Sequence, residues 1–178
     1  MSIDLSRVGA FAEEPGELNV LVETPTGSRN KYTYDERLGL FKLGGVLPAG
    51  AVFPFDFGFV PSTRGGDGDP LDVLVLMDEP AFAGCLVRAR LLGVVEAEQT
   101  ERDGETTRND RLVAVASKSH LYARARSLAS LDPGLIDEIE HFFVSYNEIK
   151  GKKFVVLGRA DAAKARQLVE SGLEEVRP

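Results

Sequence analysis

Three aspartates lie within six positions of the segment GGDGDPLDV: Asp67, Asp69 and Asp72. Asp67 and Asp69 are two residues apart, so in an extended chain their side chains share one face. Between and after them, Gly68 lets the backbone turn closely and Pro70 stiffens the next part of the chain. Two ionised carboxylates about 4 Å apart repel each other by roughly 4 kcal/mol at an effective dielectric constant of about 20. A protein that places these aspartates together therefore needs positive charge beside them.

Clustered carboxylates are the oxygen ligands that Mg²⁺, Mn²⁺ and Ca²⁺ prefer. A small number of carboxylates, completed by water, favours Mg²⁺ among these ions. An EF-hand calcium loop is disfavoured, because the aspartates fall at positions 1, 3 and 6 and no glutamate lies at the twelfth. The competing interpretation is a loop tip without a ligand, since Asp and Gly are common turn residues.

Length, charge and cysteine content restrict the class of protein. The 178 residues, 43% of them hydrophobic, suit one domain, residues 1–178, with a sizeable core. A net charge of -7 argues against a nucleic-acid partner, which requires a basic face. No apolar run approaches the roughly 18 residues that span a bilayer, and no signal peptide is recognised. A single cysteine, Cys85, excludes an internal disulfide, so we expect a cytoplasmic protein.

Short strands are predicted over the first two thirds of the chain. Apolar residues alternate there in segments that Gly, Pro, Asn or Asp separates, as in a β-barrel or sandwich. Residues 98–110 are polar with a central Asp-Gly and predict a solvated hairpin loop. The predicted strands are 18–24, 31–35, 39–47, 51–60, 71–78, 85–98 and 111–118.

The last third changes to a helical period. A helix is predicted to begin with Asp132 as its N-cap and Pro133 in its first turn, and to stop at Gly151. A strand, KKFVVLG, and a second helix capped by Asp161 come next. The apolar stripe of the first helix comprises Ile136, Ile139, Phe143, Tyr146 and Ile149. The pattern indicates an α+β fold, an antiparallel barrel with helices packed against it.

The acidic segment DGDPLDV resembles the signature of the soluble family I inorganic pyrophosphatases. The motifs VETP, KY, FPFDFGFVP, LVAV, HFF with Tyr146 after it, and KGKKF follow the family's order and approximate spacing over roughly residues 18–175. The resemblance implies a five-stranded OB-like antiparallel β-barrel with flanking strands and two helices in the C-terminal third. It also implies Mg²⁺-dependent hydrolysis of pyrophosphate to two phosphates, with Mn²⁺ as an alternative ion, and a homo-oligomer, commonly a hexamer.

The resemblance assigns roles to seven side chains. It implies that Asp67 and Asp72, together with Asp69, coordinate metal, and that Asp69 accepts a proton from a metal-bound water. It implies that Lys31 neutralises a phosphate. The remaining matched positions are Tyr146 and Arg111, which would bind the substrate, and Glu23, which would lie behind the ligands. Without the resemblance, Glu23 would be interpreted as a solvated acid at a strand end, Lys31 as a surface lysine and Tyr146 as a core residue.

Several positions depart from the family pattern. The expected carboxylates are replaced at Thr33, Gln99 and Asn109, the expected cations at Gly45 and Asn147, and a tyrosine hydroxyl is lost at Phe57. Charged hydrogen bonds to phosphate contribute about 1.5–3 kcal/mol each, so these losses predict weaker hydrolysis unless neighbours compensate. The candidates for compensation are the acids Asp103, Glu105 and Asp110 and the bases Arg37, Lys42 and Arg64.

These observations are compatible with three functions. The first is Mg²⁺-dependent hydrolysis of pyrophosphate, with full or reduced activity, which the intact Asp67, Asp69 and Asp72 favour. The second is a catalytically impaired relative that acts as a metal- or phosphate-binding regulatory module. The third is a hydrolase of another small phosphorylated compound that carries less charge than pyrophosphate. The departures from the family pattern favour the second and third.

Overall fold

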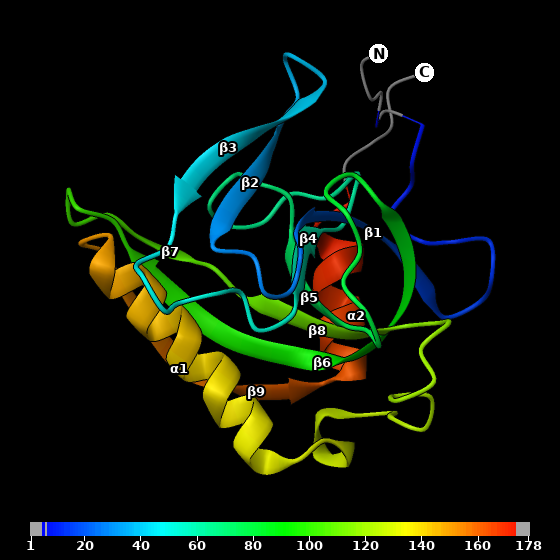
Figure 1. Ribbon diagram of the computed structural model, residues 1–178. Helices are drawn as coiled ribbons and strands as arrows, with labels where there is room; N and C mark the ends of the chain where they lie inside the picture. Colours follow the sequence, from blue (N-terminus) through cyan, green and yellow to red (C-terminus); the bar gives the residue numbers. More distant parts are fainter. Residues whose placement is uncertain (1–4, 6, 174–178) are drawn as a thin grey trace.

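The computed structural model describes residue 5 and residues 7–173. This part of the chain forms nine strands and two α-helices (Figure 1), and its buried apolar residues make two core clusters. The strands are β1 (Glu17–Thr24), β2 (Asn30–Asp35), β3 (Leu40–Val46), β4 (Asp56–Phe59), β5 (Asp72–Leu76), β6 (Leu86–Thr100), β7 (Thr106–Arg108), β8 (Arg111–Ala116) and β9 (Lys153–Asp161). The α-helices are α1 (Pro133–Ile149) and α2 (Ala162–Ser171), and a short 3₁₀ turn, Leu128–Ser130, precedes α1.

Five strands close into a ring. Neighbouring strands follow the order β1, β4, β5, β8 and β6, and β6 pairs again with β1. β6 is long enough to continue past the ring, where its second half pairs with β7 and β9. A register shift beside Gly93 bends it there, and a side chain at Gly93 would meet the carbonyl oxygen of Ala160 at 2.4 Å. The predicted five-stranded barrel is therefore confirmed.

One pair in the ring differs from the prediction of an antiparallel barrel. β5 and β8 are parallel, with Val73 beside Leu112, whereas the other pairs of the ring are antiparallel. The chain reverses between β5 and β6 and reverses again before β8, so β5 and β8 run in the same direction. Apolar alternation within each strand does not record the direction of its neighbour, which is why the sequence pattern missed this pair.

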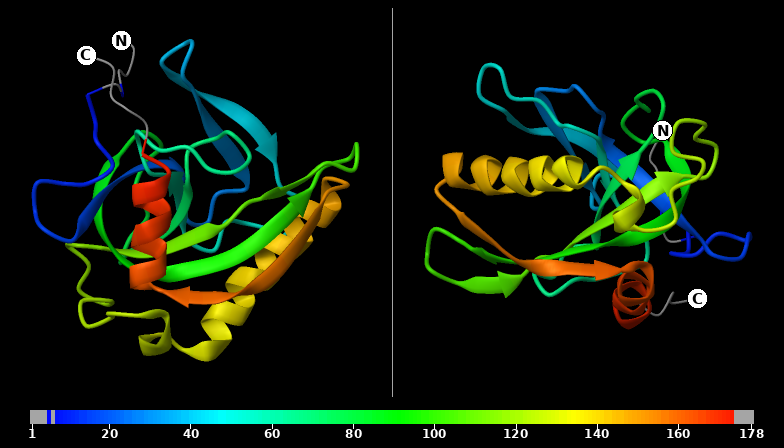
Figure 2. Two further views of the ribbon diagram at one scale, coloured as in Figure 1. Left: turned by 180° about the vertical axis from the view of Figure 1, so that it is seen from behind. Right: turned by 90° about the horizontal axis from the view of Figure 1, so that it is seen from below.

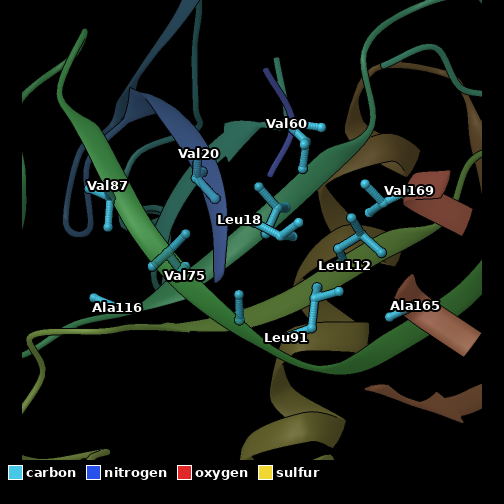
Figure 3. Packing of buried hydrophobic residues seen from close by; sticks show 14 of the residues in the cluster. Leu18, Val20, Val60, Val75, Val87, Leu91, Leu112, Ala116, Ala165 and Val169 are labelled. Atoms are coloured by element: carbon cyan, nitrogen blue, oxygen red, sulfur yellow. The ribbon is translucent and has the colours of Figure 1, made fainter. Parts of the chain in front are cut away.

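The strands β5 and β8 are buried on both faces. Val75 of β5 points into the barrel, where Ala165 and Val169 of α2 close one end (Figure 3), and Val73 belongs to the same buried cluster. On the other face, Leu74 and Leu76 pack in the layer that α1 covers. Burial of both faces explains the nearly continuous apolar sequence of these two strands, as in strands covered on both sides. Every residue of these two strands except Asp72 is buried, so the strands give the site a fixed base.

Both helices begin where the sequence predicted. The side chain of Asp132 accepts a hydrogen bond from the backbone N–H of Gly134 at 2.8 Å, and Asp161 accepts one from Lys164 at 2.9 Å. Gly151, with a φ of 71°, follows the end of α1 as a helix-stop glycine does. The stripe is shorter than predicted, because Ile149 in the last turn is exposed. Within the described residues, neither helix is long and apolar enough to cross a membrane.

Several predicted element boundaries change, including the following three. The predicted strand 51–60 is reduced to β4, because the chain before it turns, and buried Asp56 accepts hydrogen bonds from the backbone N–H groups of Thr26 and Ala81 at 2.8 Å. The polar segment 98–110 is a hairpin, as expected, but β6 and β7 extend into it and leave a turn at 101–105. The final strand continues to Asp161.

The β2–β3 hairpin is a separate two-stranded sheet that projects from the barrel (Figures 1 and 2). Its register places Lys31 opposite Gly45 and Thr33 opposite Lys42. Thr24 at the end of β1 holds the hairpin by accepting a hydrogen bond from the backbone N–H of Tyr32 at 3.0 Å. One face of the hairpin consequently overhangs the edge of the barrel at which β5 begins.

Substitution Gly58→Ala tests the close approach of β4 to β1. A Cβ at Gly58 would lie 2.1 Å from the carbonyl oxygen of Leu21, which is backbone and can move only if the barrel opens. We expect the free energy of unfolding, measured by urea denaturation, to fall by at least about 2 kcal/mol. Gly45→Ala is the control, because a Cβ there meets nothing within 4 Å. Equal stability of the two variants would contradict the proposed crowding.

Candidate active site

A cleft of about 680 Å³ lies between the β2–β3 hairpin, the loop before β5, the β6–β7 hairpin and the end of α1. Volumes in this range are typical of sites for small molecules. The cleft contains all seven side chains that the sequence singled out, although they come from separate segments of the chain. They are Glu23, Lys31, Asp67, Asp69, Asp72, Arg111 and Tyr146.

The acidic loop is held by its own backbone. Asp67 accepts a hydrogen bond from the backbone N–H of Asp69 at 3.1 Å, and Gly68 between them has a φ of 88°, a conformation that favours glycine. Arg64 donates to the carbonyl oxygen of Gly68 at 2.5 Å. Asp72 is the first residue of β5. The backbone therefore fixes the spacing of the three aspartates.

The charges of the aspartates affect one another. Asp67 is exposed as a residue, but crowding around its carboxyl group removes water and raises its pKa. The backbone hydrogen bond from Asp69 lowers this pKa, while the charges of Asp72 and Asp69 raise it further. The three carboxylates thus face a common space, and a cation would relieve the repulsion that the sequence predicted.

Glu23 lies at the back of the cleft and is buried, with 8% of its surface exposed. Its Oε1 accepts a hydrogen bond from the backbone N–H of Tyr34 at 2.7 Å, which ties the end of β1 to the hairpin. Burial raises its pKa to about 7, against the lowering effects of this hydrogen bond and of Lys31. The interpretation of Glu23 as a solvated strand-end acid is wrong, because β2 folds over it.

Arg111 is the most restrained cation of the cleft. Its Nη1 lies 2.6 Å from Oδ2 of Asp72 and donates to Oδ1 of Asn109. The guanidinium lies over the rings of Phe143 and Phe154, at 5.1 and 5.3 Å from their centroids. Only 6% of its side chain is exposed, and its Nε is buried without a hydrogen-bond partner. A planar guanidinium fits between two rings in a way that a lysine could not reproduce.

Gln99 and Asn109 form a hydrogen-bonded chain where the resemblance had led us to expect two aspartates. Asn109 donates to Oε1 of Gln99 at 3.3 Å, and Gln99 donates to Oε1 of Glu101 at 2.5 Å. Glu101 is ion-paired with Lys152 at 2.6 Å. Two carboxylates could not donate to each other, whereas two amides can. The substitution therefore removes negative charge next to the Asp72–Arg111 pair and replaces it with a neutral chain.

Aromatic side chains and Lys150 form the opposite wall. The Nζ of Lys31 lies 5.6 Å from the ring centroid of Phe57 and 5.8 Å from that of Tyr146. Lys150 donates to the hydroxyl of Tyr146, and its Nζ lies 4.2 Å from the ring centroid. Asn147 is buried and donates to the carbonyl oxygen of Phe143 at 2.9 Å, within its own helix.

Only some of the compensating residues proposed from the sequence line the cleft. Asp110 accepts hydrogen bonds from the backbone N–H of Ala97 and from Arg108, so its carboxylate is already engaged and does not take the place of Asn109. It lines a smaller neighbouring cavity of about 200 Å³, which shares Asp67, Asp72 and Asn109 with the cleft. Lys42, Arg64 and Glu105 line the cleft, whereas Asp103 and Arg37 do not.

Five charged residues of the cleft were missed by the sequence reasoning. They are Asp35, Glu36, Glu101, Lys150 and Lys152. The motif KGKKF after α1 was the available signal for the lysines, because a basic cluster at a helix end can reach the same site as the last helical turn. Glu101 had no comparable signal, since it lies in the polar hairpin among several acids.

The donor set fits Mg²⁺. Within residues 5 and 7–173, no three Asp, Glu, His or Cys side chains converge closely enough to enclose an ion. Mg²⁺, however, is commonly held by one or two carboxylates, with water and substrate phosphates completing its six ligands. Asp67, Asp69 and Asp72 supply hard oxygen atoms on an open cleft, which matches this form of binding.

Substitution Glu23→Gln tests the buried carboxyl group. Glu23 ionises near pH 4.5 when unfolded and near 7 when folded. Between these values the folded protein binds more protons, so its free energy of unfolding falls as the pH rises, by about 3 kcal/mol in all. In urea denaturation of the metal-free protein from pH 4.5 to 8, the free energy of unfolding of Glu23→Gln should fall less than that of the wild type. The exposed Glu14→Gln should keep the wild-type fall, and an identical profile for Glu23→Gln would contradict the assignment.

Comparison with known proteins places the chain in a family. Residues 20–177 match the model of the family described as inorganic pyrophosphatase. An inorganic pyrophosphatase of Nostoc sp. is 40% identical over 172 residues, 97% of this chain and 98% of that protein, and one of Synechocystis sp. is 39% identical over 94% of this chain and 96% of that protein. The crystal structure of inorganic pyrophosphatase from Thermus thermophilus superposes with a TM-score of 0.86 at 32% identity, over 98% of this chain and 99% of that one. The chain belongs to the inorganic pyrophosphatase family.

Proposed function

We propose that this chain hydrolyses inorganic pyrophosphate to two phosphates in a Mg²⁺-dependent reaction, with Mn²⁺ as an alternative ion. The observation that carries the proposal is the cleft itself, where three aspartates face several cations across a space that admits a small anion. Membership of the inorganic pyrophosphatase family supports the same reaction.

Asp67 and Asp72, together with Asp69, would hold the metal. When bound, Mg²⁺ supplies positive charge to the phosphate oxygens and lowers the pKa of a nearby water. The backbone hydrogen bond from Asp69 to Asp67 and the ion pair between Asp72 and Arg111 keep these carboxylates in place. The chain thus brings a prearranged acidic edge to the reaction, which reduces the reorganisation needed when charge develops.

Asp69 is proposed as the residue that accepts the proton of the attacking water. The water oxygen bonds to one phosphorus, the bond from that phosphorus to the bridging oxygen breaks, and the second phosphate leaves with the bridging oxygen and the bonding electrons. Lys31, Arg111 and the hydroxyl of Tyr146 are proposed to contact phosphate oxygens. Glu23 is proposed to act indirectly, by holding the β2–β3 hairpin over the cleft through its bond to Tyr34.

The departures from the family pattern are compatible with this proposal. The neutral chain of Gln99 and Asn109 adjoins the Asp72–Arg111 ion pair, so charge of both signs has been reduced together. The cleft still holds Asp67, Asp69 and Lys31. In the described residues, no observation favours a regulatory module or a different phosphorylated substrate over the hydrolase.

We further propose that the chain acts as one domain, residues 1–178, in the cytoplasm and as a homo-oligomer, with a hexamer as the expected form. Support for assembly comes from apolar side chains exposed on the projecting hairpin. They are Leu40, Leu43 and Val46, exposed by 50%, 58% and 56%. Several large apolar side chains exposed on one projecting element are compatible with a contact surface between copies of the chain.

Sedimentation equilibrium tests the assembly. The wild-type protein should sediment with the mass of a hexamer, and Leu43→Glu, which places a charge in the apolar surface of the hairpin, should yield smaller species. Lys153→Glu, on an exposed position of β9, is the charge control and should sediment as the wild type does. A monomeric wild-type protein at micromolar concentration would refute the proposed oligomer.

Phosphate release from pyrophosphate tests the proposed reaction. The purified protein should release phosphate only when Mg²⁺ or Mn²⁺ is added, and Asp69→Asn should lower the rate by about 10²–10⁴-fold, as expected for loss of a general base. Asp132→Asn is the matched control: it lies at the opposite end of α1 and exchanges one good N-cap for another. Equal rates for the wild type and Asp69→Asn would indicate a contaminating enzyme and end the proposal.

A further inference from the structure

The basic side chains of the cleft differ in what already neutralises them. Six of them line it: Lys31, Lys42, Arg64, Arg111, Lys150 and Lys152. Three are ion-paired with carboxylates of the cleft, Lys42 with Asp35 at 2.7 Å, Arg111 with Asp72 at 2.6 Å and Lys152 with Glu101 at 2.6 Å. Arg64 is engaged with the acidic loop. The two remaining basic side chains are Lys31 and Lys150.

Lys31 and Lys150 contact aromatic rings, and the acids that act on them, Glu23 on Lys31 and Glu101 on Lys150, do so beyond ion-pair distance. In the part of the chain that the structure describes, neither forms an ion pair with a carboxylate. Both approach the same ring, since the Nζ atoms lie 5.8 Å (Lys31) and 4.2 Å (Lys150) from the ring centroid of Tyr146. An aromatic ring attracts a cation but does not neutralise it. Two positive charges therefore converge on one tyrosine from different elements, β2 and the end of α1.

The geometry also leaves hydrogen-bonding capacity unused. Lys150 follows Tyr146 by four residues, so the two side chains lie on one face of the helix end. The ammonium group of Lys150 has three N–H donors, of which one reaches the hydroxyl of Tyr146. That hydroxyl accepts from Lys150, and its own proton stays available to a further acceptor. The wall of the cleft thus offers donors from two ammonium groups and one hydroxyl to an anion.

The surrounding residues leave room for such an anion. Gly45 lies opposite Lys31 in the hairpin, and a Cβ built there would meet nothing within 4 Å. Asn147, the other polar residue of the last helical turn at the cleft, is directed to the carbonyl oxygen of Phe143. Lys150 is therefore the cation that α1 presents to the cleft.

We propose that Lys150 adds a further phosphate contact to the subsite of this cleft that Lys31 and the hydroxyl of Tyr146 form. The inference rests on the proposed hydrolysis of pyrophosphate and identifies the residues that bind the oxygen atoms of one of its phosphoryl groups. Lys150 is thereby a substrate-binding residue. An anion with more than one negative charge can bind to both ammonium groups, which a neutral ligand would not do.

Steady-state kinetics of Lys150→Gln test the subsite. Loss of one charged contact to phosphate should raise KM for pyrophosphate by about tenfold to a hundredfold, with kcat changed less than about threefold. Lys150→Arg keeps the charge and should stay within about threefold of the wild-type KM. Lys153→Gln, three residues along on an exposed position outside the cleft, is the matched control and should behave as the wild type.

A binding measurement separates this inference from the proposed reaction. Imidodiphosphate, in which NH replaces the bridging oxygen, is titrated calorimetrically into each variant in the presence of Mg²⁺. Its Kd should rise for Lys150→Gln by a factor similar to that for KM, and thermal unfolding should show that the variant is folded. Tyr146→Phe, which keeps the ring, serves as a second variant and should also weaken binding.

The outcomes are distinct. An unchanged Kd for folded Lys150→Gln overturns the subsite, even if the wild type hydrolyses pyrophosphate. Absence of phosphate release by the wild type overturns the proposed reaction, and the Kd values for imidodiphosphate then decide the subsite alone. If Lys150→Gln does not fold, two other results overturn the subsite. One is an unchanged Kd for imidodiphosphate in folded Tyr146→Phe. The other is equal and full activity of Lys150→Arg and Lys150→Met, because only the arginine keeps the charge.

Discussion

The ion pair between Asp72 and Arg111 is the interaction on which the arrangement of the cleft depends. Each residue is the first of its strand, and because β5 and β8 are parallel neighbours in register, their first residues meet at the same edge of the barrel. The pair lies 2.6 Å apart at the base of the cleft. An antiparallel pairing of these strands would have sent the two charges to opposite ends. The direction of one strand pair therefore brings acid and base together.

Arg111 also contacts several parts of the fold that the core already packs together. Its guanidinium lies against Phe143 of α1 and Phe154 of β9, while its Nη1 reaches Asn109 on the chain that leads into β8. A buried charge without partners costs several kcal/mol, so this position is stable only while Asp72 and Asn109 remain in contact with it. A single side chain thus contacts the helix, the last strand and the barrel edge.

Charge in the cleft has been redistributed and not simply lost. Gln99 and Asn109 are amides at positions where acids were expected, and their hydrogen-bonded side chains lead to the ion pair of Glu101 with Lys152. Asn147 of α1 lies where a cation was expected, and Lys150 supplies a positive charge one turn later. An electrostatic site depends on the sum of charges within a few ångströms more than on the sequence position that supplies each one. This is why a comparison position by position underestimated the charge that the cleft retains.

The sequence by itself determined the elements and the acidic centre. Helix caps at Asp132 and Asp161, the barrel of short strands and the spacing of Asp67 and Asp69 all arise from local backbone chemistry, which the sequence records directly. The family resemblance added the residues that gather around this centre.

Only the tertiary structure decided the direction of β8 beside β5, the burial of Glu23 under β2 and the position of Lys150 against Tyr146. Each of these depends on contacts between segments far apart in the chain, or on where a helix end meets the barrel. Strand direction, burial and side-chain contact between elements are set by packing, and no local pattern of residues encodes them.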